Sequence, residues 1–423
     1  MTEGLTKNNI IHDAFWNYAS VAVCGCVGLS LTIIIGAYYG PATLGAFNIV
    51  FAFYIIFSQV AAFGVHHSVL KHMAEFARDA MLRRLIFSYG LIITVPLALT
   101  VSLGLWVLHA PIARVMDSPD VAQGLIWATV GLFFFALNKV LLAALNAVSR
   151  LREYAVYMAL RYVFMILGLL MMVATGQPGG NLAMILPAAE IALFCLLFWA
   201  LLDEMQWGGW SALYQWSRQH LVFGLRGFGG NLLLDLNTRV DVLCLGLFVG
   251  DRAVGIYSMA AILAESAYQL PLVLRAVFNP RVIQLLAART YGPLQALIRK
   301  TRLIVWAGMS LVAVIGTVIY PIMIPLVTGK PEYAEGSIYF MVIMVGMVIA
   351  SGYMPFGLLL INAGRPGVQT FQIVLLLLLN VSGNLVFIPF LGCLGAALAT
   401  AATHVFSLFL LRFFTRKYLK FGI

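Results

Sequence analysis

Charged residues are scarce in this sequence. Only 10% of the 423 residues are Asp, Glu, Lys or Arg, whereas 62% are hydrophobic, and the mean hydropathy is +0.97. Soluble domains carry about 25% charged residues, so the composition excludes a soluble globular protein. Apolar runs recur along the whole length and leave no room for a separate soluble domain. We therefore expect an all-α polytopic membrane protein.

Sequence signals for metal or nucleotide chemistry are also lacking. The five cysteines lie in or beside apolar segments, and Cys24-Gly-Cys26 has neither the spacing nor the partners of a metal site. No P-loop occurs, and the glycine-rich run 224–230 follows no strand, so it fails the structural context of a dinucleotide-binding loop. The longest outer connection, residues 109–120, offers little room for catalytic groups. We expect no metal, no cofactor and no catalytic residues, and hence a protein that is not an enzyme.

Twelve apolar segments are long enough to cross a bilayer, which takes about 20 residues. They lie at residues 17–38, 44–70, 85–108, 121–146, 154–175, 181–202, 221–249, 254–280, 303–327, 337–361, 367–388 and 393–412. No cleavable signal peptide is evident, because the first 16 residues lead directly into a full-length span.

Basic residues alternate sharply between the connections. With the N-terminus inside, the inner segments hold 18 of the 26 Lys and Arg residues and the outer connections hold 3. The positive-inside rule then places both termini in the cytoplasm. The net charge of +10 therefore reflects topology and contact with anionic lipids, and nucleic acid is not an expected partner.

The two halves of the chain repeat. The pattern Gly36-x3-Gly40-x3-Leu44-Gly45-x-Phe47 returns as Gly246-x3-Gly250-x3-Val254-Gly255-x-Tyr257, at a constant offset of 210 residues. Gly-rich turns recur in many membrane proteins, which is the plainer interpretation. The repeat favours two six-helix bundles in parallel topology, at residues 1–202 and 221–423. Residues 203–220 carry Trp207, Trp210, Tyr214 and Trp216, which favour the headgroup layer, and are expected to form an interfacial cytoplasmic linker.

The seventh and eighth spans carry an unusual number of charges for their depth. A charge at the centre of a membrane costs at least about 2.5 kcal/mol on insertion scales, so these spans are expected to line a polar cavity. On a helical wheel, one face of the seventh span holds Asn231, Asp235, Thr238, Arg239 and Asp241. Arg239 and Glu265 fall at nearly the same depth on adjacent antiparallel helices, which predicts an ion pair between them.

The hairpin signature Gly40-Pro41-x2-Leu44-Gly45-x-Phe47 and the segments Thr238-Arg239-Val240-Asp241 and Val254-Gly255-Ile256-Tyr257-Ser258-x-Ala260 resemble a known family. With twelve spans and a repeat at the midpoint, they are similar to the Wzx-type lipid-linked oligosaccharide flippases. These flippases belong to the multidrug/oligosaccharidyl-lipid/polysaccharide (MOP) exporter superfamily. The resemblance covers essentially the full length. The chain departs from the related peptidoglycan-precursor flippases, because it lacks arginines in the first two spans.

The resemblance implies a secondary transporter that moves undecaprenyl-pyrophosphate-linked oligosaccharides from the cytoplasmic to the periplasmic leaflet. Such units supply O-antigen, capsule or exopolysaccharide synthesis. It also implies alternating access of two bundles, driven by H⁺ or Na⁺, and contact with polysaccharide assembly proteins.

Five cations inside the spans favour an anionic cargo. They are Lys139, Arg161, Arg226, Arg239 and Arg275. All except Arg239 lie in one layer of the cytoplasmic half, where a ring of cations would attract a pyrophosphate. Alternatively, Arg226 and Arg275 extend separately to the headgroups.

Four acidic residues lie at mid-depth or further out: Glu190, Asp235, Asp241 and Glu265. A buried carboxylate binds a proton more readily than a solvated one, so each is a candidate for ion coupling. The alternative is that these charges only hold the helices together. The sequon Asn380-Val-Ser382 lies inside a span and is given no role.

Two other functions remain open. A drug or cation antiporter of the same superfamily would favour an aromatic and acidic cavity. An integral-membrane polysaccharide polymerase or lipid-dependent glycosyltransferase would need larger loops outside the membrane.

Overall fold

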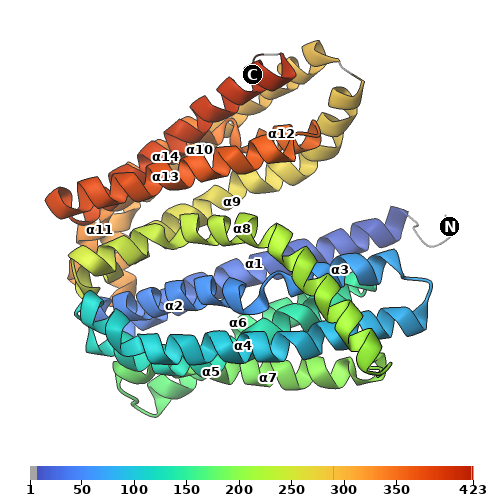
Figure 1. Cartoon of the computed structure of the whole chain (residues 1–423). Helices are drawn as coiled ribbons and strands as arrows, with labels where there is room; N and C mark the ends of the chain where they lie inside the picture. The colour runs from blue at the N-terminus through green and yellow to red at the C-terminus, as the bar shows by residue number, and fades with distance from the viewer. Residues whose placement is uncertain (1–6, 289, 421, 423) are drawn as a thin grey trace. The chain divides into compact units, whose positions relative to one another are not determined.

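The computed structural model describes residues 7–288, 290–420 and 422, which are almost entirely helical (Figure 1). Within these residues no strand occurs. Contacts divide the chain into two compact units, one formed by residues 1–38 and 46–235 and the other by residues 39–45 and 236–423. Each unit is described by itself below.

The first unit is a bundle of long helices. Its helices are α1 (Lys7–Tyr38), α2 (Pro41–Ala62) from Ala46 onward, α3 (Val65–Glu75), α4 (Ala80–Met116), α5 (Pro119–Ala147), α6 (Leu151–Ala174), α7 (Ile185–Ala200) and the first part of α8 (Trp210–Phe248). α4 and α7 both pack along α5, and α1 packs along α6. Between α6 and α7 a 3₁₀ turn, η1, spans Gly179–Met184, and a second, η2, spans Leu202–Glu204. Buried side chains of α3, α4, α5 and α7 form one apolar core.

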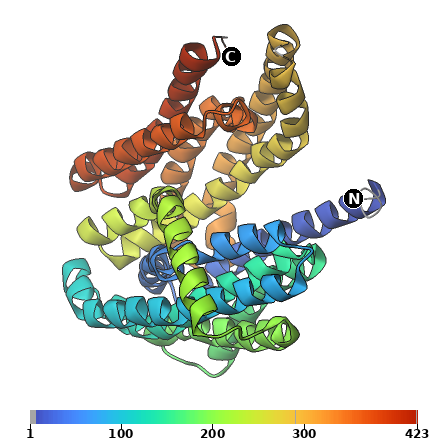
Figure 2. The same ribbon diagram turned by 45° about the vertical axis from the view of Figure 1, so that its right-hand side comes forward.

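The second unit continues from the C-terminal part of α8. It contains α9 (Asp251–Ala287), α10 (Tyr291–Thr328), η3 (Pro331–Glu335), α11 (Gly336–Ser351), η4 (Met354–Phe356), α12 (Leu359–Asn362), α13 (Pro366–Leu391), α14 (Cys393–Phe414) and the π-helical turn η5 (Thr415–Leu419). α13 and α14 lie side by side, as the two views in Figures 1 and 2 agree, and α14 also packs along α11. A core of α9, α10, η4 and α14 side chains lies between these helices.

Each of the twelve predicted spans contains a helix. In the described residues, nine helices are long and apolar enough to cross a membrane, and α9 makes ten if its bent halves count as one span. The other two are α1, whose apolar part is Ala22–Tyr38, and α8, whose charged residues lower its hydropathy. Large apolar side chains face outward on many helices; Trp199 is 79% exposed and Phe390 84%. Such surfaces suit lipid rather than water.

The predicted second span, residues 44–70, is broken. Phe63 and Gly64 both have positive φ, 44° and 72°, which ends α2 and starts α3 in a new direction. α8 crosses this break closely, since a Cβ added to Gly224 would lie 2.1 Å from the carbonyl oxygen of Phe63. Glycine is therefore required at position 224, which explains part of the glycine-rich run in the sequence.

The repeated hairpin motifs contact each other in a symmetric way. A Cβ on Gly45 would lie 1.8 Å from the carbonyl oxygen of Asp251, and a Cβ on Gly255 would lie 1.8 Å from that of Pro41. The 210-residue offset relates Gly45 to Gly255 and Pro41 to Asp251. Both contacts lie within the second unit, so the repeat found in the sequence is also a repeat in backbone packing.

The boundary between the two units does not coincide with the predicted linker, residues 203–220. The units separate after Asp235, inside α8, which runs without interruption from Trp210 to Phe248. Residues 210–220 are thus the first turns of α8. Trp207, Trp210 and Tyr214 are exposed, as expected of interfacial residues, but Trp216 is buried against His72. Bundles at 1–202 and 221–423, joined by 203–220, remain a prediction about the parts that move in transport.

α9 bends by 45° between Arg275 and Val277. Pro280 explains the bend, because a proline ring clashes with the carbonyl group four residues earlier and removes one helical hydrogen bond.

Candidate functional site

In the first unit, α5, α6 and α7 enclose a buried ion pair. The Nε atom of Arg161 on α6 lies 2.8 Å from Oε1 of Glu190 on α7. Asn138 on α5 donates through Nδ2 to Oε2 of Glu190 at 2.8 Å and to its backbone carbonyl at 2.9 Å. Glu190 is 2% exposed and Arg161 9%. Removing one member of such a pair strands the other without compensation.

Lys139 lies beside this pair. Its Nζ donates to Oγ of Ser58 at 2.8 Å and lies 4.8 Å from the centre of the Phe135 ring. The Cζ atom of Arg161 lies 4.3 Å from the centre of the same ring. Cations over an aromatic face are attracted by the quadrupole of the ring, so Phe135 helps to hold two like charges near each other.

Asp235 completes this group of charges. Gln59 donates through Nε2 to Oδ2 of Asp235 at 2.5 Å. Asp235 and Glu190 are the opposite charges that act on Lys139, and Arg161 is the like charge. We call Glu190, Arg161, Lys139 and Asp235, with their partners Asn138, Ser58 and Gln59, the first polar cluster. Its two cations are balanced by two carboxylates.

The second unit contains a carboxylate with a different environment. Asp241 on α8 accepts at Oδ2 from the Tyr257 hydroxyl at 3.0 Å and from the Thr400 hydroxyl at 2.5 Å. At Oδ1 it accepts from Nδ2 of Asn384 at 3.0 Å, and the same amide donates to Oδ1 of Asn380 at 2.8 Å. We call Asp241, Tyr257, Asn380, Asn384 and Thr400 the second polar cluster. Neutral amides and hydroxyls supply these hydrogen bonds.

One acceptor of the second polar cluster is unused. The Oδ1 atom of Asn384 is buried and, within the described part of the chain, has no hydrogen-bond partner. Buried polar atoms are nearly always paired, so this carbonyl oxygen beside a carboxylate is available to a further donor or to a cation.

The other predicted charges lie elsewhere in the two units. Glu265 on α9 is exposed, and Arg239 is the opposite charge that acts on it; their close ion pair remains a prediction. Arg226 on α8 is exposed and belongs to the first unit, whereas Arg275 lies at the bend of α9 in the second. Of the four cations expected in one ring, the structure brings together Lys139 and Arg161.

Sequence reasoning missed several partners of these charges. Asn380 was dismissed as an irrelevant sequon, yet it belongs to the second polar cluster. Its spacing of four from Asn384 places both amides on one face of a helix, a signal that could have identified them. Asn138, next to Lys139, and Tyr257, inside the repeated motif, were likewise not recognised as partners of carboxylates.

The sequence and the structure of this chain were compared with those of known proteins. Residues 39–330 match the family model described as polysaccharide biosynthesis protein. A search of curated proteins found no match. Among solved structures, the lipid II flippase MurJ in an inward closed conformation is 14% identical, with a TM-score of 0.76 over 96% of this chain and 87% of that chain.

Two transporters of another branch are also similar. An inward-facing multidrug resistance MATE family transporter of the MOP superfamily is 16% identical, with a TM-score of 0.78 over 93% of this chain and 94% of that chain. The eukaryotic MATE transporter AtDTX14 is 15% identical, with a TM-score of 0.64 over 95% and 94% of the two chains. At these identities the likeness shows the fold alone. The chain thus belongs to the family of polysaccharide biosynthesis proteins and has the helical fold of the MOP-superfamily transporters.

Proposed function

We propose that this protein is a flippase that moves undecaprenyl-pyrophosphate-linked oligosaccharides from the cytoplasmic to the periplasmic leaflet of a bacterial inner membrane. The family match to polysaccharide biosynthesis proteins carries the proposal. The fold supports transport by alternating access, because it is shared with a lipid II flippase and with MATE transporters. Transport, rather than a chemical reaction on the sugar, is then the contribution of this chain to polysaccharide synthesis.

The first polar cluster supplies the groups that would hold a pyrophosphate. Nη2 of Arg161 is buried and lacks a hydrogen-bond partner in the described residues, so its donors are unmet. Lys139 is the more accessible cation, and the hydrogen bond to Ser58 uses one of its three N–H groups. In this proposal Lys139 contacts a phosphate oxygen, and Arg161, held by Glu190, adds positive potential. Arg226, in the first unit, and Arg239 and Arg275, in the second, stay further candidates for cargo binding.

The second polar cluster would bind the coupling ion. Asp241, Asn380, Asn384 and Thr400 offer carboxylate, amide and hydroxyl oxygens, the ligands preferred by hard cations such as Na⁺. The unused oxygen of Asn384 favours a metal cation over a proton, because a proton would need only the carboxylate. Asp235, Glu190 and Glu265 are then secondary candidates, and the first two already interact with cations or amides.

Orientation follows from the charge distribution, with both termini in the cytoplasm. Ala80, the first residue of α4, and Arg114, in its last turn, are both exposed. In a cysteine-free protein, an impermeant thiol reagent added to intact cells should label a cysteine at position 114 and not one at position 80. The opposite labelling would reverse the topology.

The test of cargo binding is genetic and biochemical. In a strain without this protein, surface polysaccharide should be lost and undecaprenyl-linked oligosaccharide should accumulate. Lys139→Ala should behave like the null strain at normal abundance, and Lys139→Arg should restore part of the export.

The matched control is Lys300→Ala, which removes an exposed lysine of α10 and should export normally. Export by Lys139→Ala equal to that of the parent would remove Lys139 from the cargo site. Unchanged surface polysaccharide in the null strain, combined with new sensitivity to cationic drugs, would favour the antiporter instead.

A further inference from the structure

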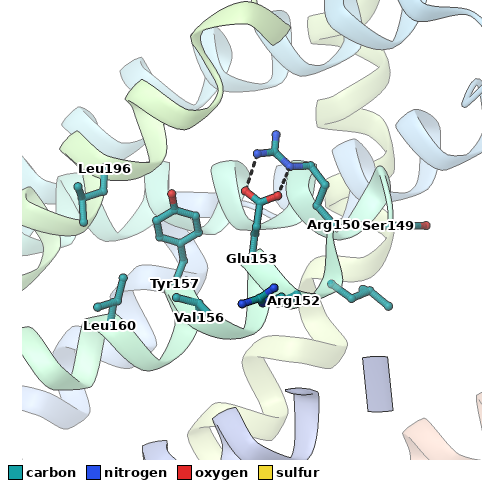
Figure 3. A pocket seen from close by; sticks show the side chains of 9 residues that line it. Ser149, Arg150, Arg152, Glu153, Val156, Tyr157, Leu160 and Leu196 are labelled. Atoms are coloured by element: carbon teal, nitrogen blue, oxygen red, sulfur yellow. Dashed lines mark hydrogen bonds and ion pairs between the residues drawn. The ribbon is translucent and has the colours of Figure 1, made fainter. Parts of the chain in front are cut away.

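A basic pocket lies at the start of α6. It has a volume of about 590 Å³ and is lined by the turn before α6, the first turns of that helix and Leu196 of α7 (Figure 3). Its polar end contains Ser149, Arg150, Arg152, Glu153 and Tyr157; its apolar end contains Val156, Leu160 and Leu196. We call it the α6 pocket. The change from charged to apolar lining follows the helix axis inward from its first residue.

The charges of the α6 pocket are partly satisfied by each other. Glu153 accepts from Nε of Arg150 at 2.7 Å and from Nη2 at 2.5 Å, as the dashed lines in Figure 3 show. Arg152 remains exposed, with its Cζ atom 4.9 Å from the centre of the Trp16 ring. The pocket therefore carries a net charge of about +1, and its acid is already engaged by Arg150.

A second pocket repeats this chemistry in the other unit. It has a volume of about 600 Å³ and is lined by Phe409, Arg412, Phe413, Arg416 and Lys417 at the end of α14. We call it the α14 pocket. Its lining contains three cations and no acid, and its two phenylalanines precede Arg416 and Lys417 in the chain.

Each pocket lies at one end of a helix, where the headgroups of a surrounding membrane are expected. α6 begins at Leu151 and α14 ends at Phe414, and both helices are apolar enough to span a membrane. Further along α6, Leu167, Leu170 and Met171 are 54%, 47% and 69% exposed, so one face of this helix meets lipid. A cavity that is basic at the headgroup level and apolar toward the membrane centre has the polarity profile of a phospholipid.

We propose that the α6 and α14 pockets bind the phosphate groups of anionic phospholipids, with acyl chains along their apolar residues. Arginine suits this role because its planar guanidinium binds two phosphate oxygens through parallel hydrogen bonds. A zwitterionic lipid would bring an ammonium group that finds no unpaired acid in either pocket. The α14 pocket, with three cations, binds more strongly than the α6 pocket.

The proposal can be tested by native mass spectrometry of the whole purified protein with dioleoyl-phosphatidylglycerol or dioleoyl-phosphatidylethanolamine. We expect the protein to retain phosphatidylglycerol preferentially. Each basic residue near a membrane surface contributes about 1 kcal/mol, so Arg152→Gln and Arg416→Gln should each weaken retention about fivefold and act additively. The matched control is Arg114→Gln, which removes an exposed arginine from the last turn of α4 that lines neither pocket.

The same phosphate chemistry could come from a phospholipid or from the lipid-linked cargo. Retention of undecaprenyl pyrophosphate by the same variants distinguishes these two ligands. If Arg152→Gln and Arg416→Gln weakened its retention and left phosphatidylglycerol unaffected, the pockets would serve the cargo and the phospholipid assignment would be wrong. Equal retention of the two phospholipids, or equal loss in Arg114→Gln, would also overturn it. Because the readout is binding, it stands apart from export, and failure here leaves the proposed flippase function untouched.

Discussion

The two polar clusters stabilise charged side chains between helices in different ways. In the first, two cations and two carboxylates from α5, α6, α7 and α8 balance each other, and Phe135 lies beneath both cations. In the second, a single carboxylate, Asp241, is held by the hydroxyls of Tyr257 and Thr400 and the amide of Asn384. In the described residues, the first keeps unmet donors on Arg161 and an unmet acceptor on Asn138, whereas the second keeps an unmet acceptor on Asn384.

The charge balance of the two clusters separates anion chemistry from cation chemistry. Unmet donors on cations suit phosphate oxygens, whereas a carboxylate held by neutral hydroxyls and amides suits a metal cation. The proposed flippase would use both, one cluster for an anionic cargo and the other for a coupling ion. The clusters also differ in what a mutation leaves behind: a stranded charge in the first, and a neutral hydrogen-bonded group in the second.

The largest effect is expected from breaking the ion pair of the first polar cluster. Glu190→Gln leaves Arg161 buried without a counter-charge and should lower the free energy of unfolding by about 3–5 kcal/mol. Thermal unfolding of the purified protein and its abundance in the membrane measure this loss. Arg161→Leu combined with Glu190→Gln should recover much of the stability, since no charge is then stranded.

Glu332→Gln is the control, because this acid pairs with exposed Arg252 and should change stability little. If the single variant Glu190→Gln were as stable as the parent protein, Glu190 would not neutralise Arg161.

A smaller effect on stability, with a specific functional loss, is expected in the second polar cluster. Asp241→Asn keeps the shape and most hydrogen bonds, so it should cost about 1 kcal/mol. The parent protein should be stabilised by NaCl relative to equal KCl, by about 1.4 kcal/mol at ten times the dissociation constant. Asp241→Asn should abolish this sodium response, whereas Asp203→Asn, an exposed control, should keep it. A sodium response that survives in Asp241→Asn would place the ion elsewhere.

Much of the fold could be predicted from composition and periodicity, because lipid imposes long apolar helices with few charges. All twelve predicted spans contain a helix, and the hairpin repeat reappears as the paired close contacts of Gly45 and Gly255. The break at Phe63–Gly64 was missed, because a positive φ at phenylalanine leaves no trace in hydropathy. The continuity of α8 through the predicted linker was missed because its tryptophans suit both an interfacial segment and a helix start.

The candidate sites were less predictable than the fold. Arg161 and Glu190 were identified as intramembrane charges, but their pairing depends on how α6 and α7 align across the 3₁₀ turn Gly179–Met184. Depth counting from helix ends predicted a pair of Arg239 with Glu265 and could not see the amides that surround Asp241. Neutral amides such as Asn384 carry no charge signal, so hydrogen-bond partners of a carboxylate emerge only when helices far apart in sequence are packed together.

The smallest effect on the sodium response comes from the same chemical change made in both clusters. Ser58→Ala and Thr400→Val each remove one hydroxyl that bonds a charged group, and each should cost about 1.5–3 kcal/mol of stability. Only Thr400→Val removes an oxygen ligand from the second polar cluster, so only this variant should shift the sodium response to higher concentration. Thermal unfolding in a NaCl series, in which KCl keeps the total salt concentration constant, measures the shift. Thr400→Ser should restore the sodium response of the parent protein. An equal shift in Ser58→Ala would mean that sodium acts on the first polar cluster as well, and the division between an anion site and a cation site would fail.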